Sequence, residues 1–310
     1  MLTRRHFLKG FGGLTLGTAA LGSYAFAVEP GLMLGVTRYN IAPATWPADL
    51  RLKIAVIADI HACEPWMSAS RIREIAEVAN ALDPDIIVLL GDFSGGHKFV
   101  TGPVMPDQWA EALSVLRAPL GVFSVLGNHD WWHGPLPGMK PDGAEGVRRG
   151  LRQAGIRLLE NDAVRLTFNG QPFWLLGLAD QMAWWSFRTG ARKGADDLAG
   201  TLRQLTDDAP AILLAHEPYI FPKVPDRVAL TLCGHTHGGQ VNFPFIGPII
   251  AEERFGPKLV YGHSNEGPRH IVVSAGLGTS IVPVRFMRPP EVVEVTVSGP
   301  GAANRPLLQS

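Results

Sequence analysis

The sequence predicts an α/β fold in which two β-sheets pack face to face and helices cover their outer faces. Between residues 52 and 126, short apolar runs rich in β-branched residues alternate with amphipathic segments, and this β-α-β-α-β order is typical of a parallel sheet. After about residue 160 the order changes to a hairpin and then mostly to strands, which indicates a second sheet. The sequence shows no internal repeat or linker after residue 27, so we expect one domain.

The first half of the chain is predicted to alternate strands with helices. Strands are expected at 36–41, 52–58, 85–90 and 122–126, and helices at 70–82, 107–117 and 143–154. The run 52–58 is apolar and too short for a typical helix, which is the pattern of a buried parallel strand. The helix at 70–82 places Ile72, Ile75 and Ala79 on one face, and Asp83-Pro84 ends it.

The second half is predicted to contain mostly strands. It begins with strands at 164–168 and 172–178, which an Asn169-Gly170 turn joins into a hairpin. A helix at 195–205 and buried strands at 211–215 and 228–233 follow. The remaining chain is expected to be all-β, with strands at 240–243, 258–261, 270–274 and 292–297.

The N-terminus carries a targeting pattern. Residues 3–9, Thr-Arg-Arg-His-Phe-Leu-Lys, resemble the twin-arginine export signal, and the uncharged stretch 10–27 ends in the cleavage pattern Ala25-Phe26-Ala27. We therefore expect residues 1–27 to be a signal peptide that engages the twin-arginine translocase, and residues 28–310 to form a single domain in the periplasm or cell envelope. The stretch is of borderline length for a membrane span, so retention as a membrane anchor remains an alternative.

Composition excludes some classes of partner. Lysine and arginine together number 28, as do aspartate and glutamate, so the net charge is zero. Because the sequence has no basic patch or arm, we expect no nucleic-acid partner. The two cysteines, Cys63 and Cys233, both lie beside polar strand ends. They are either neighbours that pair in an oxidising compartment or two small buried side chains.

Every strong strand prediction ends in an aspartate, an asparagine or a histidine. Since the carboxyl ends of parallel strands meet at one edge of a sheet, these side chains are expected to converge there. Carboxylate, amide and imidazole donors without a thiolate fit Mn, Fe, Zn or Ni. Seven ligands are too many for one ion and enough for two ions that share a carboxylate. The candidates are Asp59, His61, Asp92, Asn128, His216, His235 and His237.

These residues occur in a series of short motifs that resembles the calcineurin-like metallophosphoesterases. The motifs are Asp59-x-His61, Gly91-Asp92, Gly127-Asn128-His129-Asp130, the lone His216 and Gly234-His235-Thr236-His237. The resemblance implies a four-layer α-β-β-α sandwich of two mixed sheets. The tail motifs Gly238-Gly239-Gln240, Gly276-Leu277-Gly278-Thr279-Ser280 and Arg285-Phe286 are similar to a bacterial envelope subgroup with twin-arginine signals.

The resemblance also implies a role for each site residue. Two divalent transition-metal ions would share Asp92. The first would be held by Asp59, His61 and His237, and the second by Asn128, His216 and His235. A metal-bridging hydroxide would attack phosphorus in line. His129 would protonate the leaving oxygen, and Asp130 would orient His129.

The resemblance implies a phosphodiesterase of the cell envelope. One alternative is a pyrophosphatase of nucleotide-linked lipids, although an export signal disfavours cytoplasmic substrates. Another is a non-catalytic metal-binding scaffold, which the complete ligand set disfavours. The expected substrate is a phosphoester. Two tryptophan pairs with nearby cations either form an apolar, cationic rim that binds a lipid-linked or nucleotide phosphodiester, or belong to the core. These residues are Trp131-Trp132, Trp184-Trp185, Arg188, Arg192 and Lys193. Arg285 is a further candidate for phosphate contact.

Overall fold

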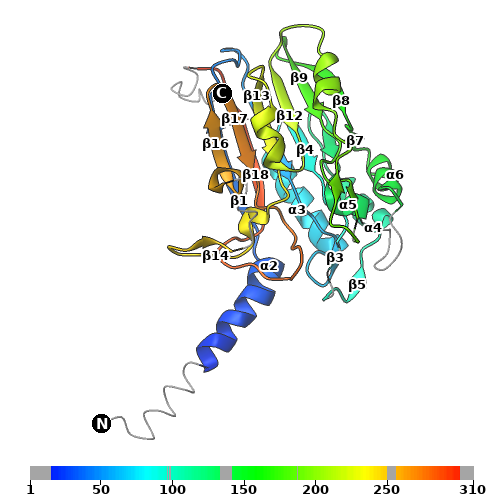
Figure 1. Ribbon diagram of the computed structural model, residues 1–310, viewed down its shortest axis with the longest axis vertical. Coiled ribbons are helices and arrows are strands. Elements are labelled where there is room, and N and C mark those ends of the chain that lie inside the picture. The colour runs from blue at the N-terminus through cyan, green and yellow to red at the C-terminus, as the bar shows by residue number, and fades with distance from the viewer. Residues whose placement is uncertain are drawn as a thin grey trace, which may run out of the picture.

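The computed structural model describes residues 15–95, 97, 99–132, 142–186, 188–249 and 256–300. Two six-stranded mixed sheets pack face to face (Figure 1). The first has the order β1 (Gly35–Ile41), β18 (Glu291–Val297), β2 (Leu52–Ile57), β4 (Ile86–Leu90), β6 (Val122–Val125), β7 (Arg157–Leu158). The second has the order β16 (Gly262–Glu266), β17 (Arg269–Val273), β13 (Val228–Cys233), β12 (Ala211–Leu214), β9 (Gln171–Gly177), β8 (Asp162–Phe168).

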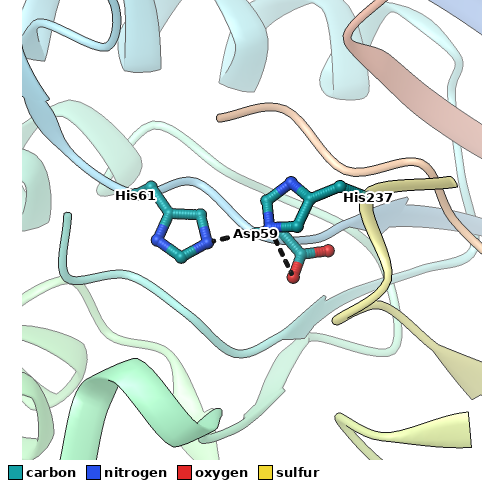
Figure 2. Close-up of side chains that lie close together, drawn as sticks. All are labelled: Asp59, His61 and His237. Atoms are coloured by element: carbon teal, nitrogen blue, oxygen red, sulfur yellow. Dashed lines mark hydrogen bonds and ion pairs between the residues drawn. The ribbon is translucent and has the colours of Figure 1, made fainter. Parts of the chain in front are cut away.

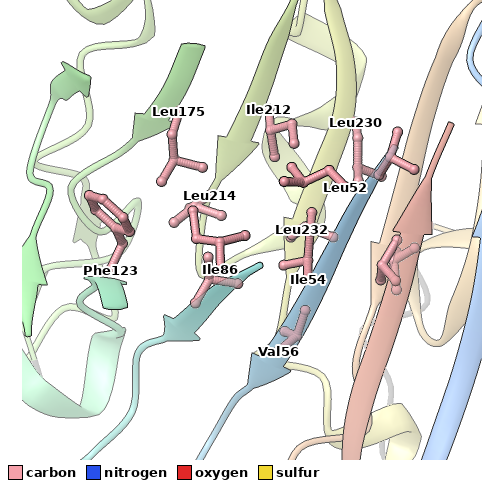
Figure 3. Close-up of a cluster of buried hydrophobic side chains, with 14 of the residues drawn as sticks. Leu52, Ile54, Val56, Ile86, Phe123, Leu175, Ile212, Leu214, Leu230 and Leu232 are labelled. Carbon is pink, nitrogen blue, oxygen red and sulfur yellow. The ribbon is translucent and has the colours of Figure 1, made fainter. Parts of the chain in front are cut away.

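The central strands are apolar on both faces because each face is covered. Residues two apart on a strand point the same way. Ile54 and Val56 of β2 therefore pack against the second sheet, where they meet Leu230 and its neighbours (Figure 3). Ala55 and Ile57 point to the opposite side and pack under the helices. This two-sided burial explains why these strands read as continuous apolar runs.

Helices complete the four layers that the sequence predicts. α3 (Ala69–Ala81), α4 (Pro106–Leu113) and α6 (Glu145–Gln153) cover the outer face of the first sheet. The hydroxyl of Ser68 accepts a hydrogen bond from the backbone N–H of Arg71 and so caps α3. α7 (Leu198–Arg203) and the 3-10 helix η2 (Pro218–Lys223) lie against the second sheet. The α/β four-layer prediction is confirmed.

One predicted strand of the second half is wrong. Residues 258–261 do not form a strand; a 3-10 helix, η5 (Pro257–Leu259), precedes β16. Leu259 and Val260 are both buried, so their apolar character reflects burial in a 3-10 helix and the turn after it, and not in a strand. The predicted strand at 240–243 shortens to β14 (Asn242–Phe243), which pairs with β15 (Gly247–Pro248) in a small hairpin.

Part of the predicted signal peptide, residues 1–14, lies outside the described residues. Residues 15–23 are helical, and η1 (Tyr24–Val28) and α2 (Glu29–Leu32) continue the helix onto the domain. The buried carboxylate of Glu29 accepts hydrogen bonds from the backbone N–H groups of Met287 and Arg288. None of the helices in the described part of the chain has the length and apolarity that crossing a membrane requires. Cleavage after Ala27 remains a prediction.

Both cysteines are free and buried, Cys63 in β3 (Cys63–Glu64) and Cys233 at the end of β13. Burial raises the pKa of Cys63 to about 11 and that of Cys233 well above its usual value. We therefore expect neither thiol of the native protein to react with Ellman's reagent at neutral pH, and both to react in concentrated guanidinium chloride. Rapid reaction of either thiol before unfolding would contradict its buried position.

Candidate metal centre

The strands that carry the predicted ligands end at one edge of the two sheets. β2, β4 and β6 of the first sheet, and β12 and β13 of the second, each lead within a few residues to a candidate ligand. Six of the seven candidates are buried and His235 is half-buried. The structure brings together all the residues that the sequence singles out: Asp59, His61, Asp92, Asn128, His216, His235 and His237.

Asp59, His61 and His237 form the first half of this cluster (Figure 2). Nε2 of His61 lies 3.1 Å from Nε2 of His237, which in turn lies 3.9 Å from Oδ1 of Asp59. One ligand atom from each residue lies within 4.8 Å of the others. The three donors are therefore close enough to bind a single ion.

His216, Asn128 and His235 form the second half. Oδ1 of Asn128 lies 3.2 Å from Nε2 of His216 and 2.9 Å from Nδ1 of His235. Nε2 of His216 is also 4.0 Å from Oδ1 of Asp59, so the two halves adjoin. An amide oxygen between two imidazoles offers one oxygen and two nitrogen donors to a second ion.

Asp92 connects the two halves. Its Oδ2 lies 3.4 Å from Nε2 of His61 and 3.2 Å from Nε2 of His216. Its other oxygen, Oδ1, accepts a hydrogen bond of 2.8 Å from the backbone N–H of His129. A carboxylate in contact with a histidine of each half is placed as a bridging ligand would be.

Backbone carbonyls orient two of the histidines. Nδ1 of His61 lies 3.1 Å from the carbonyl oxygen of Ser94, and Nδ1 of His216 lies 2.6 Å from that of Leu90. Since a carbonyl oxygen only accepts, each Nδ1 carries the proton and donates it. The Nε2 atoms, which point into the cluster, are thereby left with the lone pair that a metal ion requires.

The local backbone at the centre is strained. Five of the seven candidate ligands have positive φ angles between 47° and 70°, a conformation that costs a non-glycine residue about 1–3 kcal/mol. They are Asp59, His61, Asp92, His235 and His237. Such strain persists only where the surrounding structure enforces it, and it clusters at functional sites. The pattern was not visible in the sequence, since none of these residues is a glycine.

Two glycines of the tail motif make room for the first ligands. A Cβ at Gly278 would lie 2.4 Å from the carbonyl oxygen of Ile60 and 2.7 Å from Cβ of His61. A Cβ at Gly276 would lie 2.6 Å from Cβ of Asp59. The sequence showed these glycines only as part of a motif, whereas the structure shows that they allow a loop to cover the strand end.

The ionisation of the cluster fits a bound cation. Burial lowers the pKa of His235 to about 3 and that of His237 well below its usual value, so both are neutral and have free lone pairs at pH 7. Burial raises the pKa of Asp59 to about 7, and the neighbouring Asp92 charge adds to this effect. Oδ2 of Asp59 has no hydrogen-bond partner among the described residues. Although burial opposes its charge, the neighbouring carboxylates of Asp92 and Asp59 raise the pKa of His216 well above its usual value. Two buried carboxylates that attract positive charge in this way suit divalent ions, whose binding would displace the proton of His216.

His129 lies beside the cluster on α5 (Asn128–Trp132). It is half-buried, its ring centroid is 4.8 Å from that of His61, and its Nε2 is 3.3 Å from Oγ of Ser280. The imidazole is thus at the margin of the centre, with access to whatever binds there. Its use as an acid remains a prediction.

The neighbouring Asp130 is fully buried and accepts four backbone hydrogen bonds. The donors are the N–H groups of Asp92, Phe93, Ser94 and Gly127, at 2.8 to 3.0 Å. These bonds join the loop after β4 to the loop after β6. They make Asp130 a positioning residue for Asp92, and its predicted effect on His129 remains untested.

The comparison with known families agrees with this geometry. The family model described as Calcineurin-like phosphoesterase matches residues 52–266, a range that contains every candidate ligand. The chain belongs to the calcineurin-like phosphoesterase family. It is therefore a metal-dependent phosphoester hydrolase. The family is dinuclear and metal-dependent, and the Asp and His groups described above supply donors for metal ions.

Several relatives match this phosphoesterase over nearly their whole length. An uncharacterised metallophosphoesterase of Bacillus subtilis (strain 168), YkuE, is 31% identical over 96% of this chain and 98% of its own. One of Aquifex aeolicus (strain VF5) is 32% identical over 91% and 97%. The phosphodiesterase YaeI of Escherichia coli (strain K12) is 29% identical over 94% and 98%.

The two tryptophan pairs of the phosphoesterase meet next to His129. β10 (Trp184–Trp185) pairs with β11 (Arg192–Lys193) and lies on α5. The ring centroids of Trp132 and Trp185 are 4.8 Å apart, and that of Trp132 is 5.5 Å from His129. The guanidinium of Arg192 lies 5.8 Å from the ring centroid of Trp185, and the ammonium of Lys193 lies 5.5 Å from that of Trp184, which also contacts Trp131. The structure thus joins the four predicted tryptophans, Arg192 and Lys193 into one surface beside the centre, which we call the tryptophan surface.

Arg285 does not face a substrate, so its predicted phosphate contact is wrong. The side chain is fully buried and donates hydrogen bonds to the carbonyl oxygens of Ala275, Gly278 and Arg288. Its Nη2 also lies 3.3 Å from Nδ1 of His237. Burial lowers the pKa of Arg285 to about 10, which still leaves it charged at neutral pH. Through these hydrogen bonds Arg285 holds the tail loop in place next to His237 of the first half of the cluster.

A buried pair of carboxyl groups, Asp180 and Glu217, lies behind His216 and was missed in the sequence. Glu217 contributes to a cluster with His216 and His235 whose ligand atoms lie within 4.8 Å of one another. Burial and the adjacent Glu217 raise the pKa of Asp180 well above its usual value. The only signal in the sequence was that Glu217 follows a predicted ligand, which does not distinguish it from a surface glutamate.

Proposed function

We propose that this phosphoesterase is a phosphodiesterase of the bacterial cell envelope that works with two divalent transition-metal ions, Mn, Fe, Zn or Ni. The observation that carries the proposal is the position of Asp92, whose Oδ2 contacts one histidine from each half of the cluster. A relative that spans nearly the same length is named a phosphodiesterase. The ligand sets follow the two halves: Asp59, His61 and His237 for one ion, Asn128, His216 and His235 for the other, and Asp92 for both.

Two bound ions would neutralise phosphate charge and lower the pKa of water to give a nucleophile near neutral pH. Side chains of the protein would position the group that donates the proton. Asp92 fixes the backbone of His129 through the bond to its N–H, and Ser280 lies against the imidazole Nε2 from the other side. Held in this way, His129 is suited to deliver a proton to the leaving oxygen, since imidazole groups in general exchange protons near neutral pH.

The envelope location rests on the N-terminal pattern. We propose that residues 1–27 act as a twin-arginine signal and residues 28–310 as a single phosphoesterase domain, exported already folded. Because the helical residues 24–32 dock on the domain through Glu29, Ala25 and Phe26, retention of the segment as an anchor is the alternative. Mass spectrometry of protein recovered from an envelope fraction decides between them, as a chain that starts at residue 28 has been cleaved.

The experiment is metal analysis together with hydrolysis of bis-p-nitrophenyl phosphate. We expect about two metal ions per chain, loss of turnover in a chelator and recovery with Mn²⁺. The variant His129→Gln should lower kcat about 10²- to 10⁴-fold and leave the metal content unchanged, because the residue acts on the proton and not on the ions.

The matched control is His263→Gln, which changes an exposed histidine of β16 and should leave kcat unchanged. Near-normal turnover of His129→Gln would remove His129 from the mechanism. A metal-bound wild-type protein without turnover on phosphomonoesters or phosphodiesters would instead favour the non-catalytic scaffold.

A further inference from the structure

Five large apolar side chains project into solvent near the metal centre. Phe245, Ile246 and Ile249 lie in and after the β14–β15 hairpin, and Ile281 and Met287 lie in the loop 279–288. Their exposed fractions run from 50% to 108%. We call these five residues the apolar rim. Single exposed apolar residues are ordinary, but a group of this kind marks an interaction site.

The two segments of the apolar rim form one surface. The backbone N–H of Asn242 donates to the carbonyl oxygen of Phe286 at 2.9 Å, and the rings of Phe243 and Phe286 have centroids 5.2 Å apart. The side chain of Gln240, just after His237, also donates to the carbonyl oxygen of Val282. The hairpin and the loop therefore move as a unit that is attached directly to a metal ligand.

The backbone holds several of these side chains outward at a cost. Phe245, Ile281 and Met287 have φ angles of 68°, 67° and 53°. A bulky residue in this region is a genuine outlier, and for the β-branched isoleucine the strain is greatest. A water-exposed loop would gain stability from glycine or asparagine at such positions. Retention of strained, exposed apolar residues indicates that they contact something apolar.

The N-terminal helix leaves the domain from the same surface. The backbone N–H of Arg285 donates to the carbonyl oxygen of Ala25 at 2.9 Å, and the rings of Tyr24 and Phe286 have centroids 6.4 Å apart. In Figure 1 the helix extends away from the domain beside the β14 hairpin. Residues 15–23 are all exposed and none is charged. The only polar side chains of this stretch are the hydroxyls of Thr15, Thr18 and Ser23, and an exposed helix without charge is better suited to a lipid interface than to water.

Charge is sparse in the apolar rim's own segments. Residues 241–249 contain no aspartate, glutamate, lysine or arginine, and the loop 279–288 contains only Arg285, which is buried, and Arg288, which is half-buried. The most exposed side chains form a projecting tip, not a hollow, and an isolated tip inserts readily between lipid headgroups. A protein partner would need a complementary hollow, whereas a bilayer accepts any apolar projection. Together with the uncharged helix, this shape favours a lipid surface.

We propose that the apolar rim docks on a lipid bilayer, so that the metal centre faces phosphoesters carried by membrane lipids. The docking itself stands on the apolar rim alone, and the choice of a lipid-borne substrate rests on the function proposed above. Ser280, in the rim loop, touches His129 from one side, and Trp132 lies against it from the other. The His129 side of the centre is thus flanked by the rim loop and by the tryptophan surface.

The test is sedimentation of the full-length protein with phosphatidylglycerol–phosphatidylcholine vesicles. To reduce binding by the N-terminal helix, all proteins carry Leu16→Asp and Leu21→Asp. On this background, Phe245→Asp with Ile246→Asp should weaken partition into vesicles by about tenfold or more, since two large apolar side chains no longer enter lipid. The matched control, Asn169→Asp with Asn265→Asp, adds the same charge at two exposed positions, one in the β8–β9 turn and one in β16, and should not change partition.

Two activity measurements separate docking from catalysis. The rim variant should hydrolyse soluble bis-p-nitrophenyl phosphate at the control rate and lose most hydrolysis of a phosphodiester lipid in vesicles. Equal vesicle partition of rim variant and control overturns the proposal. The proposal is also overturned if the control protein is a dimer in ultracentrifugation, the rim variant is a monomer and neither protein binds vesicles. That result would assign the apolar rim to contact with a second copy of this chain. If no protein hydrolyses any phosphoester but partition still falls, docking stands and the proposed function fails.

Discussion

Replacing Asp92 with alanine should reduce kcat/KM for bis-p-nitrophenyl phosphate by at least about 10³-fold, which corresponds to about 4 kcal/mol of transition-state stabilisation. Three contacts are lost together. Oδ2 no longer lies between His61 and His216, and Oδ1 no longer accepts the backbone N–H of His129. A single side chain therefore supports both metal half-sites and the proposed acid.

The same variant should bind fewer metal ions. The two halves of the cluster would keep three donors each, but without the shared carboxylate the positive charge of two adjacent ions would be poorly compensated. Metal analysis after gel filtration should show the stoichiometry falling from about two toward one or less. Thermal unfolding of wild type and variant in a chelator shows whether the loss comes from the site or from the fold.

Asp92→Asn separates charge from shape. The amide oxygen can still accept from the backbone N–H of His129, whereas the amide nitrogen cannot act as a bridging ligand. We expect its activity to be nearly as low as that of Asp92→Ala, with the native fold retained. Asp208→Ala is the matched control, because this aspartate is exposed and precedes the start of β12, whereas the ligands follow the strands' carboxyl ends, and its activity should be unchanged. An Asp92→Ala protein with two bound metals and a tenth or more of wild-type activity would refute the bridging role.

The positions of the metal candidates were predictable because they depend on the strand pattern. β2, β4, β6, β12 and β13 are largely apolar, with only Lys53, Ser124 and Thr231 as polar residues inside them, so the polar residues that follow each strand emerge at the same edge. The backbone conformation of Asp59 and His61 was not predictable in this way: both have positive φ, so the chain turns sharply at each residue after β2.

What the sequence did not reveal are contacts between distant segments. Arg285 seemed available for phosphate because an arginine in a loop has no evident partner, yet four acceptors in the fold surround it. Leu259 and Val260 read as strand because both are apolar. Both are buried, but η5 ends at Leu259, which packs in the core on the outer face of the second sheet. Single-sequence patterns report on local periodicity, whereas these residues respond to packing that closes over them.

Of the contacts between distant segments, those of Asp130 are expected to have the largest effect on the free energy of unfolding. Its carboxylate accepts four backbone hydrogen bonds, two on each oxygen, from the loops that carry Asp92 and Asn128. Alanine would leave four N–H groups without an acceptor at a buried position. An unsatisfied buried donor costs about 1–3 kcal/mol, and partial relaxation makes such losses less than additive. We expect Asp130→Ala to lower the free energy of unfolding by about 3–5 kcal/mol.

Urea unfolding measured in a chelator tests this value without a contribution from metal binding. The matched control is Asp197→Ala, which removes another aspartate that accepts a backbone N–H, from Gly200 at the exposed start of α7, and should cost only about 1 kcal/mol. If Asp130→Ala costs no more than this control, water or other groups satisfy the loops and the positioning role is wrong. If it costs several times more, and metal content falls with it, then Asp130 stabilises the metal centre by holding the backbone on which Asp92 lies.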